Sequence, residues 1–212
     1  MKMLKKVFLL ILSVSGFGLP GDLSIGADLV SRYVWRGSDF GNAAAVQPSM
    51  SYSAGNFEIG AWSSWAINGA ITGNENDLSI TYSKDGLSVT LSDYFFPAYS
   101  GNDNIDKFGN DGAHVFEAMV GCEFGKFDLL ATINIYGADS DHSKYAELDY
   151  NFYSKDETNA SFFIGAGDFL YVANNNFNVV NVGISASRGK FTTAYIINPD
   201  QKTSFFTITF SL

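Results

Sequence analysis

Two arginines are the residues of this chain whose types and spacing most suggest chemistry. Arg32 and Arg36 lie in the stretch ADLVSRYVWRGSDFGN, residues 27–42, between apolar and aromatic neighbours. Because a guanidinium group binds carboxylates and phosphates, the pair could be a catalytic pair, a ligand clamp or the solvated face of a wall. The choice depends on the structural element that positions them.

The other residue types give an enzymatic site little support. A hydrolase nucleophile needs a base within reach, and the chain has two histidines, His114 and His142. In an alternating strand Glu117 would lie on the face opposite His114, and Ser143 directly follows His142, which is poor catalytic geometry. The chain has no nucleophile elbow, zinc-protease motif or phosphate-binding loop, and one cysteine cannot form a disulfide framework or a cysteine-rich metal site. We therefore expect no enzyme, no cofactor and no metal site.

The segment that carries the arginines has a period of two. From Asp22 to Arg36 most odd positions are apolar and most even positions are small or charged. One face is thus apolar over about fourteen residues, which is longer than a usual globular strand and suits a tilted strand that crosses a membrane. On such a strand both Arg32 and Arg36 lie on the polar face.

The same alternation recurs between turn signals along the chain after residue 21. It predicts about twelve strands, an even number, as bacterial outer-membrane barrels have. Short turns alternate with longer loops rich in Gly, Asn and Asp, a sorting that such a barrel explains and a β-sandwich does not. The predicted fold class is therefore all-β, a transmembrane up-and-down antiparallel β-barrel. The predicted strands are 22–37, 45–53, 56–67, 76–84, 87–96, 113–124, 127–137, 144–153, 160–171, 177–187, 190–197 and 204–212.

Aromatic residues on the apolar face occur near both ends of the predicted strands, with aliphatic residues between them. This profile is typical of a wall that faces lipid, because aromatic side chains favour both membrane interfaces. A sandwich core would instead mix large and small residues along each strand. The residues predicted for the lipid-facing aromatic belts are Trp35, Trp65, Phe57, Tyr82, Phe124, Phe127, Phe152, Phe162, Phe191 and Phe210.

The opposite face of the strands carries many polar residues, which can be buried only if they are hydrated or paired. Twelve strands predict a narrow pore. We expect Arg32 and Arg36 to stack on one side of the lumen and to face carboxylates across it. They then form either a constriction with a transverse field or a salt-bridge network that closes the barrel. The pore-lining candidates are Arg32, Arg36, Glu58, Glu117, Glu147 and Asp149.

The N-terminal residues have the layout of an export signal, with Lys2, Lys5 and Lys6 before a short apolar run. The run is too short to span a bilayer, and a buried N-terminal helix is the less favoured alternative. We predict a signal peptide at 1–18, cleaved between 16 and 20, and an outer-membrane barrel at 19–212. Without three lysines of the leader, 10 basic residues face 22 acidic ones, and a net charge near −12 argues against nucleic acid as a partner.

The stretch SRYVWRGSDFGNAAAVQPSMSYSAGNFEIGAWSSW, residues 31–65, resembles the opening of the TorF-like family of porins. Further similar stretches are SDYFFP at 92–97, SKYAELDY at 143–150 and the final INPDQKTSFFTITFSL, so the resemblance covers nearly the whole mature chain. The members of this family are bacterial outer-membrane proteins of mostly unknown function. The resemblance implies a small outer-membrane β-barrel and names no substrate.

These features predict a porin-like channel of the bacterial outer membrane, through which small polar solutes diffuse passively along a narrow, acidic lumen. The expected partners are outer-membrane lipid, the small polar solutes and the barrel-assembly machinery, and the oligomeric state is left open. One alternative is a closed structural or adhesive outer-membrane barrel without transport activity. A soluble secreted β protein is the third hypothesis.

Overall fold

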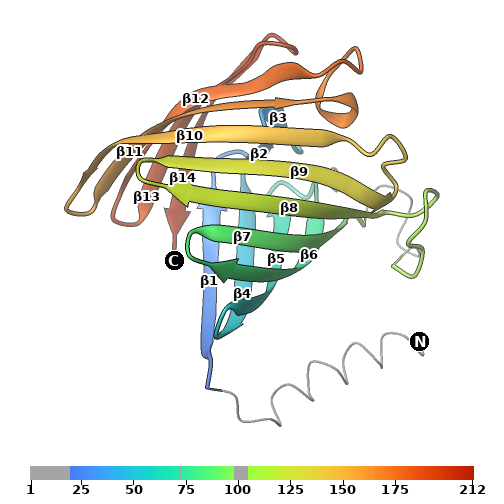
Figure 1. Ribbon diagram of the computed structural model, residues 1–212. Coiled ribbons are helices and arrows are strands. Elements are labelled where there is room, and N and C mark those ends of the chain that lie inside the picture. Colours follow the sequence, from blue (N-terminus) through green and yellow to red (C-terminus); the bar gives the residue numbers. More distant parts are fainter. Residues whose placement is uncertain (1–19, 72, 98–104) are drawn as a thin grey trace.

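Twelve strands pair antiparallel into one closed barrel (Figure 1). The structure is a computed structural model that describes residues 20–71, 73–97 and 105–212, and the predicted signal peptide lies outside these residues. The all-β fold class and the predicted number of barrel strands are confirmed. The barrel strands are β1 (Asp22–Val30), β4 (Ala45–Ala54), β5 (Phe57–Ala66), β6 (Glu75–Lys84), β7 (Leu87–Phe95), β8 (His114–Phe124), β9 (Phe127–Gly137), β10 (Lys144–Lys155), β11 (Thr158–Gly167), β12 (Asn178–Arg188), β13 (Phe191–Asn198) and β14 (Thr203–Ser211).

The wall consists of sequential hairpins. Each strand from β4 to β13 pairs with the next strand along the chain, and β1 closes the ring between β4 and β14. Short turns favour this order, since antiparallel neighbours need only a tight turn. At Asp85 and Gly86 both central residues have positive φ, 52° and 81°, as a two-residue hairpin turn requires. The closing seam is uneven, with nine register pairs between β1 and β4 and three between β1 and β14.

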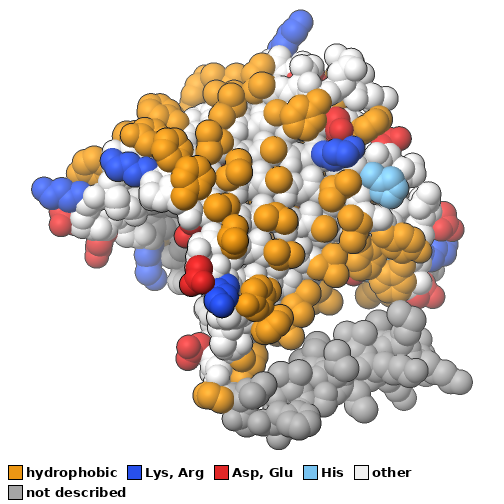
Figure 2. Space-filling view, in the orientation of Figure 1, with side chains coloured by type: hydrophobic (Ala, Val, Ile, Leu, Met, Phe, Trp, Pro, Cys, Tyr) orange, Lys and Arg blue, Asp and Glu red, His pale blue; other side chains and the backbone are white. Residues whose placement is uncertain are grey.

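The alternation along the strands sorts side chains between the two faces of the wall. Ile59 and Ile80 pair across β5 and β6 with both side chains exposed, by 44% and 45%. Thr81 and Thr90, on the opposite face, share a hydrogen bond of 2.8 Å across β6 and β7. Figure 2 shows apolar side chains over much of the outer wall in this view, with charged side chains mainly towards its ends. The barrel therefore has an apolar outside and a polar inside.

The first predicted strand, 22–37, is wrong beyond Val30. There the chain leaves the wall and forms the hairpin of β2 (Val34–Trp35) and β3 (Ser38–Asp39), which pair with each other. Arg36 and Gly37 make its turn, with φ of 49° and 77°. An alternation of apolar and charged residues is compatible with a hairpin inside a barrel as well as with a strand of the wall. The period of two alone therefore could not distinguish these two structures.

The second large difference concerns the predicted strand 160–171. The strand β11 ends at Gly167, and a single 3-10 turn, η1 (Phe169–Tyr171), follows it and buries Tyr171. The other predicted strand boundaries differ from the observed ones by two residues or fewer. Among the described residues, no helix is long and apolar enough to cross a membrane.

The hairpin turn gives a first testable prediction, because a side chain at Gly37 would clash with the carbonyl oxygen of Val180 on β12. We expect Gly37→Ala to lower the free energy of unfolding by about 1–3 kcal/mol beyond its backbone strain, through the displaced contact. Gly55→Ala is the matched control, since Gly55 also has positive φ but no atom lies within 4 Å of its added Cβ. Denaturant unfolding in detergent measures the free energy of unfolding of both variants. Equal losses of stability would show that the approach of Gly37 to Val180 does not matter for stability.

Candidate functional site

The internal hairpin, defined as residues 31–44, touches the barrel wall on several sides. The hydroxyl of Tyr33 donates to Glu75 of β6 at 2.8 Å, and Nδ2 of Asn198 at the end of β13 donates to the carbonyl of Gly37 at 3.1 Å. Its tip reaches Glu117 on β8, which is five strands from β1 in one direction around the ring and seven in the other. The internal hairpin therefore crosses the lumen to the opposite wall.

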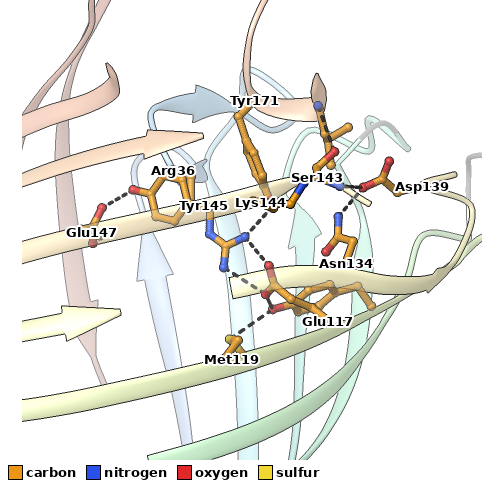
Figure 3. Close-up of polar contacts among 12 residues, drawn as sticks. Arg36, Glu117, Met119, Asn134, Asp139, Ser143, Lys144, Tyr145, Glu147 and Tyr171 are labelled. Atoms are coloured by element: carbon orange, nitrogen blue, oxygen red, sulfur yellow. Dashed lines mark hydrogen bonds and ion pairs between the residues drawn. The ribbon is translucent and has the colours of Figure 1, made fainter. Parts of the chain in front are cut away.

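A buried ion pair fixes the tip of the internal hairpin (Figure 3). Arg36 Nη1 and Nη2 donate to Oε1 and Oε2 of Glu117 at 2.6 and 2.9 Å, and the two side chains are 6% and 0% exposed. Arg36 also donates to the Tyr171 hydroxyl at 2.5 Å, and the Tyr94 hydroxyl donates to Glu117 Oε2 at 2.6 Å. Both charged groups thus have several hydrogen-bond partners, as burial requires.

Three aromatic rings surround the guanidinium group of Arg36. Its Cζ lies 4.3 Å from the ring centroid of Trp35, 4.6 Å from that of Tyr145 and 5.3 Å from that of Tyr171. Burial acts to lower the pKa of Arg36, but the hydrogen bonds with Glu117 and the nearby Tyr171 raise this pKa above its ordinary value. The rings and the carboxylate therefore hold a permanent positive charge inside the barrel.

The position of Trp35 corrects its assignment to the lipid-facing aromatic belts. Trp35 lies in β2, inside the barrel, where its ring packs against Phe40, Tyr94 and Tyr171 with centroids 5.7, 5.8 and 5.8 Å away. The assignment followed from the first predicted strand, which continued the wall to residue 37. Since the chain turns inward after Val30, the apolar face at this position meets the lumen.

Arg32 does not stack with Arg36 in the lumen, which corrects the predicted arrangement of the two arginines. Arg32 Nη1 lies 2.5 Å from Oδ2 of Asp39, within the internal hairpin, and its side chain is 35% exposed. The hairpin turn separates the two guanidinium groups, because they no longer follow one straight strand. The structure therefore brings together Arg36 and Glu117, and it pairs Arg32 locally.

The other predicted pore-lining carboxylates lie elsewhere along the inner wall. Glu147 Oε2 accepts a hydrogen bond from Asn181 at 2.6 Å and another from Tyr145. Glu58 accepts from serines near the turn between β4 and β5. Asp149 on β10 is the register partner of Asp128 on β9. These carboxylates are distributed along the lumen and do not form one ring opposite Arg36.

Most of the predicted belt residues are exposed aromatic side chains of the wall. Contact of these rings with lipid stays a prediction. The residues with more than a third of their surface exposed are Trp65, Phe57, Tyr82, Phe124, Phe127, Phe162 and Phe191, and those partly exposed are Phe152 and Phe210.

Sequence reasoning missed several partners of the internal hairpin. Glu75 binds Tyr33, Tyr171 binds Arg36, and Asn198 binds Gly37, across separations of 42, 135 and 161 residues. No local pattern links positions so far apart. The sequence indicated only that many polar residues face inward and that each of them needs a hydrogen-bond partner inside the barrel.

In the described part of the chain, one cavity lies nearer the short turns of the barrel and another lies at the rim of the longer loops. The first has a volume of about 260 Å³ and is lined by small polar residues together with Glu58, Trp62 and Asp77. The second, about 380 Å³, is lined by Trp35 and Phe40 of the internal hairpin and by residues of the loops after β9 and β11. Within the described ranges, no group of three or more His, Cys, Asp or Glu is arranged to hold a metal ion.

Fold and site together define a closed twelve-stranded β-barrel whose lumen contains a hairpin held by a buried ion pair. A family model described as a bacterial protein of unknown function (Gcw_chp) matches residues 16–211, and the chain belongs to this family. A comparison with curated proteins finds no match. The finer resemblance to TorF-like porins stays a prediction.

The ion pair gives a second testable prediction. Arg36→Met leaves Glu117 buried without its cation, and we expect a loss of about 3–5 kcal/mol in the free energy of unfolding. The double variant Arg36→Met with Glu117→Gln removes both charges and should recover part of this loss. Arg32→Met is the matched control, because its partly exposed pair with Asp39 should contribute about 1 kcal/mol or less.

Denaturant unfolding in detergent, followed by tryptophan fluorescence, compares these variants. Equal losses from Arg36→Met and Arg32→Met would show that the buried pair does not hold the internal hairpin.

Proposed function

We propose that the chain is a porin-like channel of the bacterial outer membrane in which the internal hairpin forms the constriction. The observation that carries this proposal is the position of the hairpin, which crosses a polar lumen and is held by the Arg36–Glu117 pair on the opposite wall. Cavities towards both rims leave room for solute on either side of it. Solutes then move down their gradient past a narrow, hydrogen-bonded segment.

Location in the outer membrane is supported by the outer surface of the barrel. A closed barrel pairs the backbone groups of its wall, which hydrocarbon requires, and large apolar side chains such as Ile25, Val89 and Phe57 are 77%, 56% and 55% exposed. In water so much exposed apolar surface favours aggregation. Membership of a bacterial family and the predicted signal peptide agree with this location.

The charges of the lumen favour cations and neutral solutes over anions. Glu58 lines the cavity nearer the short turns, and Asp139 and Asp141 line the cavity at the loop rim. The buried cation between them, Arg36, is neutralised by Glu117. Rings or clusters of carboxylates raise the local concentration of cations in a pore.

A second candidate function is a closed structural or adhesive barrel without transport. The same ion pair favours it, because a bidentate, fully buried contact supported by three rings could hold the internal hairpin permanently in place. The two functions differ in whether the lumen conducts ions.

Planar-bilayer recording gives the third testable prediction. We expect small, cation-selective currents from the wild-type protein and a severalfold larger conductance from the double variant Arg36→Ala with Glu117→Gln, because the hairpin tip loses its attachment. Arg32→Ala is the control and should conduct like the wild type.

Anion preference would contradict the acidic lumen as the source of selectivity. An absence of conductance in both the wild type and the double variant would support the closed structural barrel instead.

The membrane location has its own test, which is the fourth prediction. We expect the protein to fractionate with the outer membrane, to need detergent for extraction and to migrate faster on gels when unheated, since a closed barrel resists unfolding by detergent. Recovery in the soluble periplasmic or secreted fraction without detergent would contradict the proposal and favour a soluble β protein.

A further inference from the structure

The cavity at the loop rim, here called the mouth cavity, lies between the internal hairpin and wall and loop residues outside that hairpin. Aromatic rings from separate segments meet there: Trp35 and Phe40 from the internal hairpin, Tyr94 and Phe96 from β7 and the residue after it, and Phe169 from η1. Phe40 and Phe96 stack with their ring centroids 6.4 Å apart. At about 380 Å³, the mouth cavity falls at the small end of the roughly 300–1,000 Å³ common for ligand pockets.

The charged residues that line the mouth cavity are both acidic. Asp139 and Asp141 lie on its β9–β10 side, and no Lys, Arg or His is among the described lining residues. Burial acts to raise the pKa of Asp139, but hydrogen bonds from Asn134 and Ser143 outweigh it and hold that pKa below its ordinary value. Asp139 therefore carries a negative charge at neutral pH.

Two cations in contact with lining rings, Arg36 and Lys144, are already paired. Arg36 lies over the ring of Trp35 but forms its ion pair with Glu117. Lys144 lies 6.0 Å from the ring centroid of Phe169, with its Nζ 3.6 Å from Oδ2 of Asp168. The negative charge of the mouth cavity is thus not cancelled by either of them.

A buried amide adds a further acceptor at this place. Asn134 lines the mouth cavity and is 1% exposed, and its Nδ2 donates to Asp139 Oδ2 at 2.7 Å. Its Oδ1 is buried and has no hydrogen-bond partner among the described residues. The cavity is therefore rich in hydrogen-bond acceptors, negatively charged and lined by aromatic rings.

We propose that the mouth cavity binds a small organic cation that carries an aromatic or other apolar group. The rings bury the apolar group and attract the cation through their π faces, while Asp139 and Asp141 supply opposite charge. An anion would meet two carboxylates, and a small inorganic cation would leave the rings uncovered. Binding itself does not need conduction, although the role of this cation as a transported solute rests on the proposed channel.

Calorimetric titration of the whole protein in a non-ionic detergent tests the proposal with three probes. Benzyltrimethylammonium combines charge and ring, tetramethylammonium has the charge alone, and benzenesulfonate has a ring with the opposite charge. We expect saturable binding of benzyltrimethylammonium, binding of tetramethylammonium at least about fivefold weaker, and no measurable binding of benzenesulfonate.

Two variants locate the site. Asp141→Asn should weaken binding of benzyltrimethylammonium about threefold to tenfold, whereas Asp156→Asn, the same charge change at the β10–β11 turn on the opposite rim, should leave it unchanged. Phe96→Leu should weaken binding by a similar factor, and Phe191→Leu on the outer wall should not.

The outcomes separate this proposal from the channel. Equal effects of Asp141→Asn and Asp156→Asn, binding of benzenesulfonate, or no binding by folded protein would overturn the organic-cation site. If the protein conducts but does not bind the probe, the site fails and the channel stands. If it binds the probe but never conducts, the channel fails and the site stands.

Discussion

The buried contact between Arg36 and Glu117 is the interaction on which the arrangement of the lumen depends. Withdrawing two charges from water is unfavourable, and the pair is tolerable only with near-ideal geometry and further partners. The bidentate hydrogen bonds, the hydroxyls of Tyr94 and Tyr171 and the surrounding rings supply both conditions. The ion pair therefore holds the tip of the internal hairpin against β8.

The wall of the barrel was predictable because strands with one apolar and one polar face leave a simple pattern in the sequence. A period of two, turn residues and the alternation of short and long connections specified twelve strands, and most of their ends agree with the structure to within two residues. The interior obeys no such period. The stretch from Arg32 to Arg36 alternates as a wall strand does, yet it leaves the wall after Val30, and this one departure moved Trp35 inside and separated the two arginines.

The candidate site was predictable only in part, for a related physical reason. The sequence placed Glu117 on the inward face as one of four carboxylates, with Glu58, Glu147 and Asp149, that could face the arginines, since buried charges need partners of opposite sign. Which carboxylate and which arginine pair depends on a hairpin turn that needs Gly37 against Val180 and Asn198 against the backbone. Those contacts join segments far apart in sequence, and no local pattern predicts them. The strands of the wall could be predicted from alternation along the chain, whereas the contacts inside the lumen depend on the folded arrangement.

The internal hairpin adds contacts across the closing seam of the barrel, where β1 meets β14. Three register pairs join β1 to β14, fewer than join any other two neighbouring strands of the ring. The internal hairpin begins at this seam, reaches past β14, and accepts hydrogen bonds at Gly37 and Ser38 from Asn198 and Gln201, at the end of β13 and just beyond it. The internal hairpin thus links the two sides of the seam. If β1 separated from β14, the contacts with Asn198 and Gln201 and the Arg36–Glu117 pair on the opposite wall would resist the movement.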